Sequence, residues 1–128
     1  MEKHCVTAPD GAPPVGPYSP ALAMGGLLFS AQGPFDADGA IVGHSAGEQT
    51  RKTLENVRGL LIAAGLDMDA VAKTTIYLTD MADFAAVNEV YAEFFTAPYP
   101  ARATIGVHSL PLGVKALIDV IAVAEGAP

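Results

Sequence analysis

Hydrophobic residues recur at helical spacing in the middle of the chain. Steps of three and four residues, the period of one helix face, separate Leu54, Val57, Leu61 and Ala64. Ser45 and Glu48 precede this face in the arrangement of a capping box. Gly65 follows it, where a helix commonly ends. The pattern therefore predicts a helix over residues 46–64.

Further hydrophobic runs predict a second helix and four strands. A second helical face is formed by Phe84, Val87, Tyr91 and Phe94. Asp80 can cap this helix, and Pro98 and Pro100 end it. Residues 8–20 hold five of the ten prolines, which excludes a helix and predicts an extended lead-in. Apolar or β-branched runs predict strands over residues 27–31, 71–79, 102–107 and 114–124.

The order of these elements predicts an α+β fold. The order is β-α-β-α-β-β, and a further strand or hairpin can precede it. Two amphipathic helices would cover one face of a mixed sheet. The last strand, 114–124, is apolar almost throughout, which indicates burial on both sides. We expect another copy of the chain to cover the second face.

Composition supports a small protein that associates with itself. The 128 residues suit one domain, 1–128, and 51% of them are hydrophobic against 16% charged. Such a short chain has more apolar surface than it can bury alone, which favours a homo-oligomer. The net charge of −7 disfavours nucleic acid as a partner. We expect no membrane span and, because no signal-peptide core follows the N-terminus, a cytoplasmic protein.

The chemistry-bearing residues are sparse. Cys5 is the single cysteine, and the three histidines have no metal-ligand spacing, so we expect no metal. If Val107 pairs with Val114 in a hairpin, Arg102 lies directly opposite Asp119. This pair could be a buried ion pair or the two ends of a substrate cleft. From spacing alone, the ion pair is the preferred interpretation.

Several short motifs, taken together, resemble the Rid family, the reactive intermediate deaminases or YjgF-like proteins. The resemblance runs from about Gly16 to Val123, in matching order and spacing. Its segments are Gly16-Pro17-Tyr18-Ser19, Ser30-Ala31-Gln32-Gly33, Leu54-Glu55-Asn56-Val57, Ala63-Ala64-Gly65, Val71-Ala72-Lys73-Thr74-Thr75, Asp83-Phe84, Val87-Asn88-Glu89-Val90-Tyr91, Phe94-Phe95 and Pro100-Ala101-Arg102.

The resemblance implies a chorismate-mutase-like α+β fold and a homotrimer with clefts between subunits. It implies that Arg102 binds the carboxylate of a 2-imino acid and that Asp119 positions a water. Tyr18 would line the cleft from the neighbouring subunit. Ser30 and Asn88 match further substrate-binding positions.

The chain departs from the family pattern at three places. Ala31 stands where the family has a glycine, which tightens any close backbone approach. Thr104 replaces a common cysteine at a position that offers backbone groups to the ligand. Asp119 replaces a glutamate and is one methylene shorter. Displacing a reacting group by about 1 Å can cost on the order of a hundredfold in rate. These departures therefore weaken the expectation of efficient turnover most.

The preferred function is hydrolytic deamination of 2-enamino or 2-imino acids, such as those from 2-aminoacrylate, to 2-keto acids and ammonia. Backbone groups near Thr104 and Ala31 would hold the imine nitrogen, and no cofactor is needed. Alternatives are a non-catalytic module that binds 2-keto acids or other small carboxylates, and a deaminase specialised for another enamine such as 2-aminomuconate. Ribonuclease or translation-inhibitor activity is disfavoured by the acidic charge and the lack of a basic patch.

Overall fold

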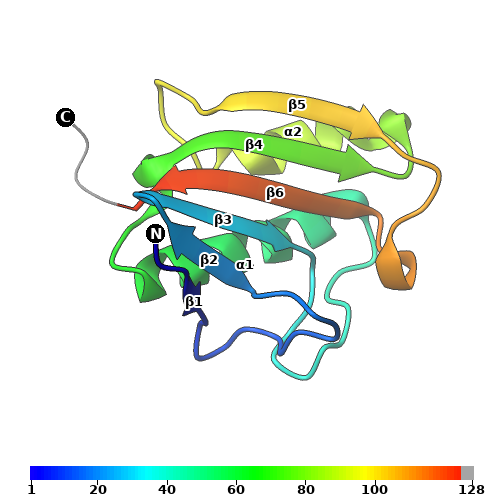
Figure 1. Ribbon diagram of the computed structural model, residues 1–128. Helices are drawn as coiled ribbons and strands as arrows, with labels where there is room; N and C mark the ends of the chain where they lie inside the picture. The colour runs from blue at the N-terminus through cyan, green and yellow to red at the C-terminus, as the bar shows by residue number, and fades with distance from the viewer. Residues whose placement is uncertain (125–128) are drawn as a thin grey trace.

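A computed structural model describes residues 1–124; the last four residues of the predicted domain, 125–128, lie outside the described residues. A six-stranded mixed sheet has the order β1-β2-β3-β6-β4-β5, and α1 and α2 lie on one of its faces (Figure 1). The predicted α+β fold class is confirmed. The elements are β1 (His4–Val6), β2 (Ala21–Met24), β3 (Leu27–Gln32), α1 (Ala46–Ala63), β4 (Val71–Leu78), α2 (Phe84–Ala92), β5 (Ala101–Gly106) and β6 (Ala116–Val123).

The start of α1 is fixed by the predicted capping box. The Ser45 hydroxyl accepts a hydrogen bond from the Glu48 N–H at 3.1 Å, and the Glu48 carboxylate accepts one from the Ser45 N–H at 3.0 Å. These bonds satisfy backbone donors that the first helical turn leaves free. Gly65 adopts a φ of +79° just past the helix, where a side chain would be strained. The prediction of this helix is confirmed, and the helix ends one residue early.

The second helix is shorter than its apolar face suggests. Asp80 caps a 3₁₀ turn, Met81–Asp83, rather than α2 itself, by accepting a hydrogen bond from the Ala82 N–H at 2.9 Å. Phe94 lies beyond the end of α2 but is still buried. Helical spacing therefore identified the buried side of this segment better than its exact ends.

The predicted hairpin between the last two strands is wrong. β5 pairs in parallel with β4, and β6 lies between β3 and β4, antiparallel to both. The segment between β5 and β6 therefore passes the end of β4. A nearly continuous apolar strand suits a central position with a neighbour on each edge, and β6 takes that position.

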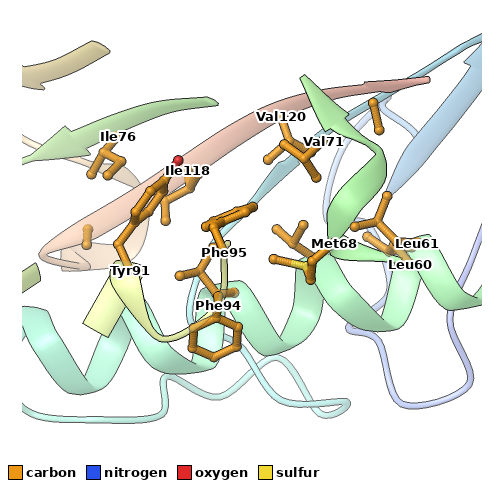
Figure 2. Packing of buried hydrophobic residues seen from close by; sticks show 14 of the residues in the cluster. Leu60, Leu61, Met68, Val71, Ile76, Tyr91, Phe94, Phe95, Ile118 and Val120 are labelled. Carbon is orange, nitrogen blue, oxygen red and sulfur yellow. The ribbon is translucent and has the colours of Figure 1, made fainter. Parts of the chain in front are cut away.

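The hydrophobic core fills the space between the sheet and the helices. Figure 2 shows Tyr91, Phe94 and Phe95 packed among side chains of α1 and the sheet. In β6, buried and partly buried residues alternate, because every second side chain points away from the helices. On that second face, which we call the open face, Leu27, Phe29 and Ile105 are 37%, 38% and 44% exposed. Within residues 1–124, the open face has no covering layer.

Neither helix of the described chain is long and apolar enough to cross a membrane.

Candidate functional site

Arg102 lies on the helix-facing side of the sheet, where β5 pairs Arg102 with the buried Thr74 of β4. Its guanidinium carbon is 4.8 Å from the centre of the Tyr91 ring and 5.7 Å from that of Phe84. Both distances are within the range of a cation–π interaction. The neighbouring cavity of about 360 Å³, the arginine cavity, is lined by Asn88, Tyr91, Ala92, Tyr99, Pro100 and Arg102.

A hydrogen bond to Thr74 holds the Tyr91 ring that packs against Arg102. The hydroxyls of Tyr91 and Thr74 are 2.8 Å apart and share a hydrogen bond. Burial raises the pKa of Tyr91, although this bond and the charge of Arg102 act in the opposite direction. The phenol therefore stays neutral, and a rigid aromatic face positions the guanidinium. Arg102 itself is only partly buried and keeps donors available for an anion.

Asp119 lies on the open face. A second cavity of about 570 Å³, the aspartate cavity, is lined by Ser19, Leu22, Phe29, Ser30, Ala31, Lys73, Thr75, Asp119, Val120 and Ile121. Asp119 pairs with Ala31 of β3 on one side and with Thr75 of β4 on the other. Its Oδ2 atom accepts a hydrogen bond of 2.9 Å from the Tyr77 hydroxyl. That bond, then burial, raises the pKa of Tyr77.

Lys73 places one positive charge in the aspartate cavity. Its Nζ donates to the Thr74 carbonyl at 3.1 Å and to the Thr75 hydroxyl at 3.0 Å. The ammonium is thus held along β4, and in residues 1–124 it forms no ion pair with Asp119. The cavity combines a cation, a carboxylate and the Ser30 and Thr75 side chains, an arrangement that can hold a polar molecule and a water.

Ser30 of β3 and Tyr18 both form hydrogen bonds with the N-terminal arm, residues 8–20. The Ser30 hydroxyl donates to the Pro20 carbonyl at 2.6 Å and accepts from the Gln32 amide at 3.1 Å. Tyr18 is 57% exposed, and its hydroxyl accepts from the Val15 N–H at 3.2 Å. Tyr18 lines a third cavity of about 380 Å³, the arm cavity, which shares Ser19 and Ala31 with the aspartate cavity.

The residues predicted from the sequence thus fall into two groups in one chain. Tyr18, Ser30, Ala31 and Asp119 gather around the aspartate and arm cavities. Asn88 and Arg102 line the arginine cavity, and Thr104 follows Arg102 on the same side of β5.

The predicted direct pairing of Arg102 with Asp119 is wrong, and the sheet topology gives the reason. β4 separates their strands, and the register places the two side chains on opposite faces of the sheet. Neither residue takes part in the ion pairs found within residues 1–124. The buried ion pair preferred from spacing is therefore wrong as well.

Sequence reasoning named none of three residues near the candidate site as site residues: Lys73 and Tyr99, which line its cavities, and Tyr77, which donates to Asp119. Lys73, Thr75 and Tyr77 alternate along β4, so polar groups occupy one face of a strand at a period of two. That alternation was the available signal. It gives no indication that Tyr77 reaches Asp119, 42 positions along the chain. Residues 1–124 contain no cluster of His, Cys, Asp and Glu that could hold a metal ion.

Comparison with known proteins adds an independent line of evidence. A family model described as endoribonuclease L-PSP matches residues 9–124. The chloroplastic Reactive Intermediate Deaminase A of Arabidopsis thaliana is 41% identical over 124 residues, 95% of this chain and 66% of that protein.

Two solved structures agree over almost the whole chain. A putative endoribonuclease from Thermotoga maritima has a TM-score of 0.91 at 38% identity, covering 98% of this chain and 100% of that one. Escherichia coli TdcF with bound serine has a TM-score of 0.87 at 37% identity, covering 94% and 98%. Fold, sequence and motif order lead to one assignment: this chain belongs to the endoribonuclease L-PSP family, which includes the Rid proteins that its sequence resembles.

Proposed function

We propose that this protein is an imine deaminase that hydrolyses 2-imino acids, formed from enamines such as 2-aminoacrylate, to 2-keto acids and ammonia. The observation that carries the proposal is Arg102. Its guanidinium packs over Tyr91 and Phe84 at the arginine cavity, without a carboxylate partner in residues 1–124. A planar, fixed guanidinium is suited to binding a substrate carboxylate through two hydrogen bonds.

The reaction needs a water and a base beside the bound imine. Asp119 would accept a proton from the water while the water oxygen bonds to the imine carbon. The electron pair of the C=N bond moves to nitrogen, which takes up a proton. The resulting carbinolamine expels ammonia as its hydroxyl becomes the carbonyl of the keto acid. Backbone groups near Thr104 and Ala31 would hold the nitrogen, and the reaction uses no metal or cofactor.

Arg102 and Asp119 lie on opposite faces of the sheet in one chain, so we propose that neighbouring copies in a homotrimer complete each site. One copy would contribute Arg102, Asn88 and Thr104, and its neighbour Asp119, Ser30 and the Tyr18 arm. The exposed apolar residues of the open face support such an assembly, because a subunit interface would remove them from water. TdcF, which binds serine in its crystal structure, supports a site of amino-acid size.

The first test is a coupled assay. A PLP-dependent dehydratase generates 2-aminoacrylate from serine, and the decay of the 2-imino acid is followed with and without this protein. We expect faster decay with the wild-type protein and none of this acceleration with Arg102→Ala. Wild-type activity in Arg102→Ala would contradict the proposal.

The shared site has its own test, which mixes two inactive variants. Arg102→Ala and Asp119→Asn chains are each assayed alone and after co-refolding in equal amounts. If each site draws on two copies, random assortment restores about a quarter of the sites. Sites within single chains would stay inactive in every mixture, and that result would rule out the shared arrangement.

A second candidate is a module that binds 2-keto acids without turnover. The shorter carboxylate of Asp119 and the side chain of Ala31 favour it, because both reduce how well a water and a nitrogen can be placed. Calorimetric binding of a keto acid without imine hydrolysis would select this alternative. The net charge of −7 gives no support to RNA cleavage, although the family model carries that name. A cytoplasmic location stays a prediction.

A further inference from the structure

The arm cavity differs from the other two cavities in the chemistry of its wall. The arginine cavity is lined by Arg102, and the aspartate cavity by Lys73 and Asp119. The arm cavity, of about 380 Å³, has no Asp, Glu, Lys, Arg or His among its lining residues. Its largely apolar side chains include Pro13, Val15, Tyr18, Phe35, Leu112 and Leu117. A cavity of this size and composition suits an apolar group better than a charged one.

The amide side chains in this wall already donate their hydrogen bonds within the fold. The Asn56 amide nitrogen donates to the Gly33 and Phe35 carbonyls, both at 2.9 Å. The Gln32 amide nitrogen donates to a backbone carbonyl and to a serine hydroxyl, each at 3.1 Å. An amide nitrogen has two N–H donors, so both side chains use all of theirs within the chain. A polar group that entered the cavity would therefore lose hydrogen bonds to water and regain few.

The wall around Phe35 is formed before any ligand arrives. A side-chain carbon placed on Gly33 would lie 2.6 Å from the Phe35 ring, so this ring packs directly on the Gly33 backbone. Asn56 of α1 holds the carbonyls of the same two residues. A wall that is fixed by the fold lowers the ordering cost of binding.

Leu112 adds a residue with a strained backbone to the wall. Its φ of +59° and ψ of +15° are in the left-handed region, which a leucine disfavours and an asparagine or glycine tolerates. Leu112 is 68% exposed, so burial in the core does not compensate for this conformation. Backbone strain of this kind concentrates at ligand sites, and Leu112 lines the arm cavity.

The arm cavity adjoins the aspartate cavity, because Ser19 and Ala31 line both. We propose that the arm cavity takes the side chain of the substrate, and that the protein therefore prefers 2-imino and 2-keto acids with bulky aliphatic side chains. The inference rests on the proposed function in one respect: Arg102 of a neighbouring copy binds the carboxylate. Leu112 and Leu117 are then residues that determine specificity.

Calorimetry with 2-keto acids tests this preference without any turnover. Pyruvate, 4-methyl-2-oxopentanoate and 2-oxoglutarate share the keto-acid group but carry a methyl, a branched aliphatic and a charged side chain. Each buried methylene should tighten binding about fourfold, so the branched acid should bind about tenfold or more tightly than pyruvate. It should also bind more tightly than 2-oxoglutarate, whose second carboxylate the apolar wall disfavours. Equal affinity for the branched acid and either of the others would overturn the inference and leave the proposed function intact.

Leu112→Asn tests the wall with a substitution that the backbone favours. Asparagine tolerates the left-handed conformation, so this variant should unfold thermally at or above the wild-type temperature. Loss of the apolar side chain should lower the ratio of the two affinities, branched acid to pyruvate, by about three- to tenfold. Leu117→Asn makes the same exchange from β6 and should also lower the ratio. If neither variant lowers it, the cavity does not hold the side chain and the inference is overturned.

Ile62→Asn is the matched control for these variants. Ile62 is 61% exposed on α1 and lines none of the three cavities. The ratio of the two affinities in this variant should equal that of the wild type. A ratio lowered as much as in Leu112→Asn would show that the effect does not come from the arm cavity, and would overturn the inference.

A kinetic assay separates the inference from the proposed function. An L-amino-acid oxidase generates 2-imino acids from leucine and from alanine, and their decay is followed with each protein. We expect the wild-type kcat/KM to be about tenfold or more higher for the leucine-derived imine, and Leu112→Asn to lose most of this difference. Hydrolysis of both imines with equal kcat/KM would overturn the inference alone. A protein that hydrolyses neither imine but distinguishes the keto acids would overturn the deaminase function and retain the side-chain site.

Discussion

At the scale of single residues, the aromatic rings under Arg102 are the feature with the clearest consequence for substrate binding. An arginine on a strand can adopt many rotamers, and fixing its guanidinium costs side-chain entropy on binding. Tyr91 and Phe84 hold the guanidinium beside the arginine cavity before substrate arrives. Part of the ordering cost is therefore met by folding rather than by binding.

Phe84 provides the more practical test of this arrangement, because it is 39% exposed whereas Tyr91 is buried. Phe84→Leu removes a cation–π contribution of about 0.5–1 kcal/mol. We expect KM for a 2-imino acid to rise about two- to fivefold with kcat nearly unchanged, measured by steady-state kinetics. Phe84→Tyr keeps the ring and serves as the control. A Phe84→Leu enzyme with wild-type KM would show that this ring does not hold Arg102.

At the scale of elements, the capping box of α1 connects local sequence to stability. Ser45→Ala removes the side-chain acceptor of the Glu48 N–H and should lower the free energy of unfolding by about 1 kcal/mol. Urea denaturation measures this change. Ser109→Ala, an exposed loop serine, is the control and should unfold like the wild type. Equal unfolding of the two variants would argue against the cap.

The same box predicts a pH dependence. Backbone N–H groups of Ser45 and His44 donate to the Glu48 carboxylate and lower its pKa below the ordinary 4.5. A lowered folded-state pKa stabilises the fold above the ordinary value, and this stabilisation is lost as pH falls through the lowered pKa. We measure the midpoint temperature of thermal unfolding at a series of acid pH values. As the pH falls, this temperature should decrease less steeply in Glu48→Gln than in the wild type. Identical slopes would contradict the assignment.

Local patterns and long-range pairing differ in how far the sequence reveals them. The helix over residues 46–64, the four strands and the buried side of α2 follow from periodicities that neighbouring residues carry. The insertion of β6 between β3 and β4 depends on pairing between distant segments, which no local periodicity records. For the same reason the predicted pairing of Arg102 with Asp119 is wrong, and the hydrogen bond from Tyr77 to Asp119 was not foreseen.

At the scale of the whole molecule, the open face links assembly to activity. Ile105 of the edge strand β5 is 44% exposed on this face, which the proposed trimer would bury. Ile105→Glu should give monomers by light scattering and abolish deaminase activity, because a buried, unpaired charge is costly and the divided site is lost.

Ile62→Glu is the matched control for that experiment. Ile62 is 61% exposed on α1, on the side of the molecule that the helices cover. This variant should keep the assembly and the activity of the wild type. If Ile105→Glu also kept both, the open face would not be the subunit interface.

The central place of β6 also has a consequence for synthesis of the protein. β3 and β4 have no contact with each other as sheet neighbours; only β6, among the last segments of the chain, joins them. While the ribosome still holds that segment, β1 to β3 and the pair β4 and β5 are two separate pieces with unpaired edges. The sheet is therefore completed only after β6 has left the ribosome, and until then the edges of the two pieces stay unpaired.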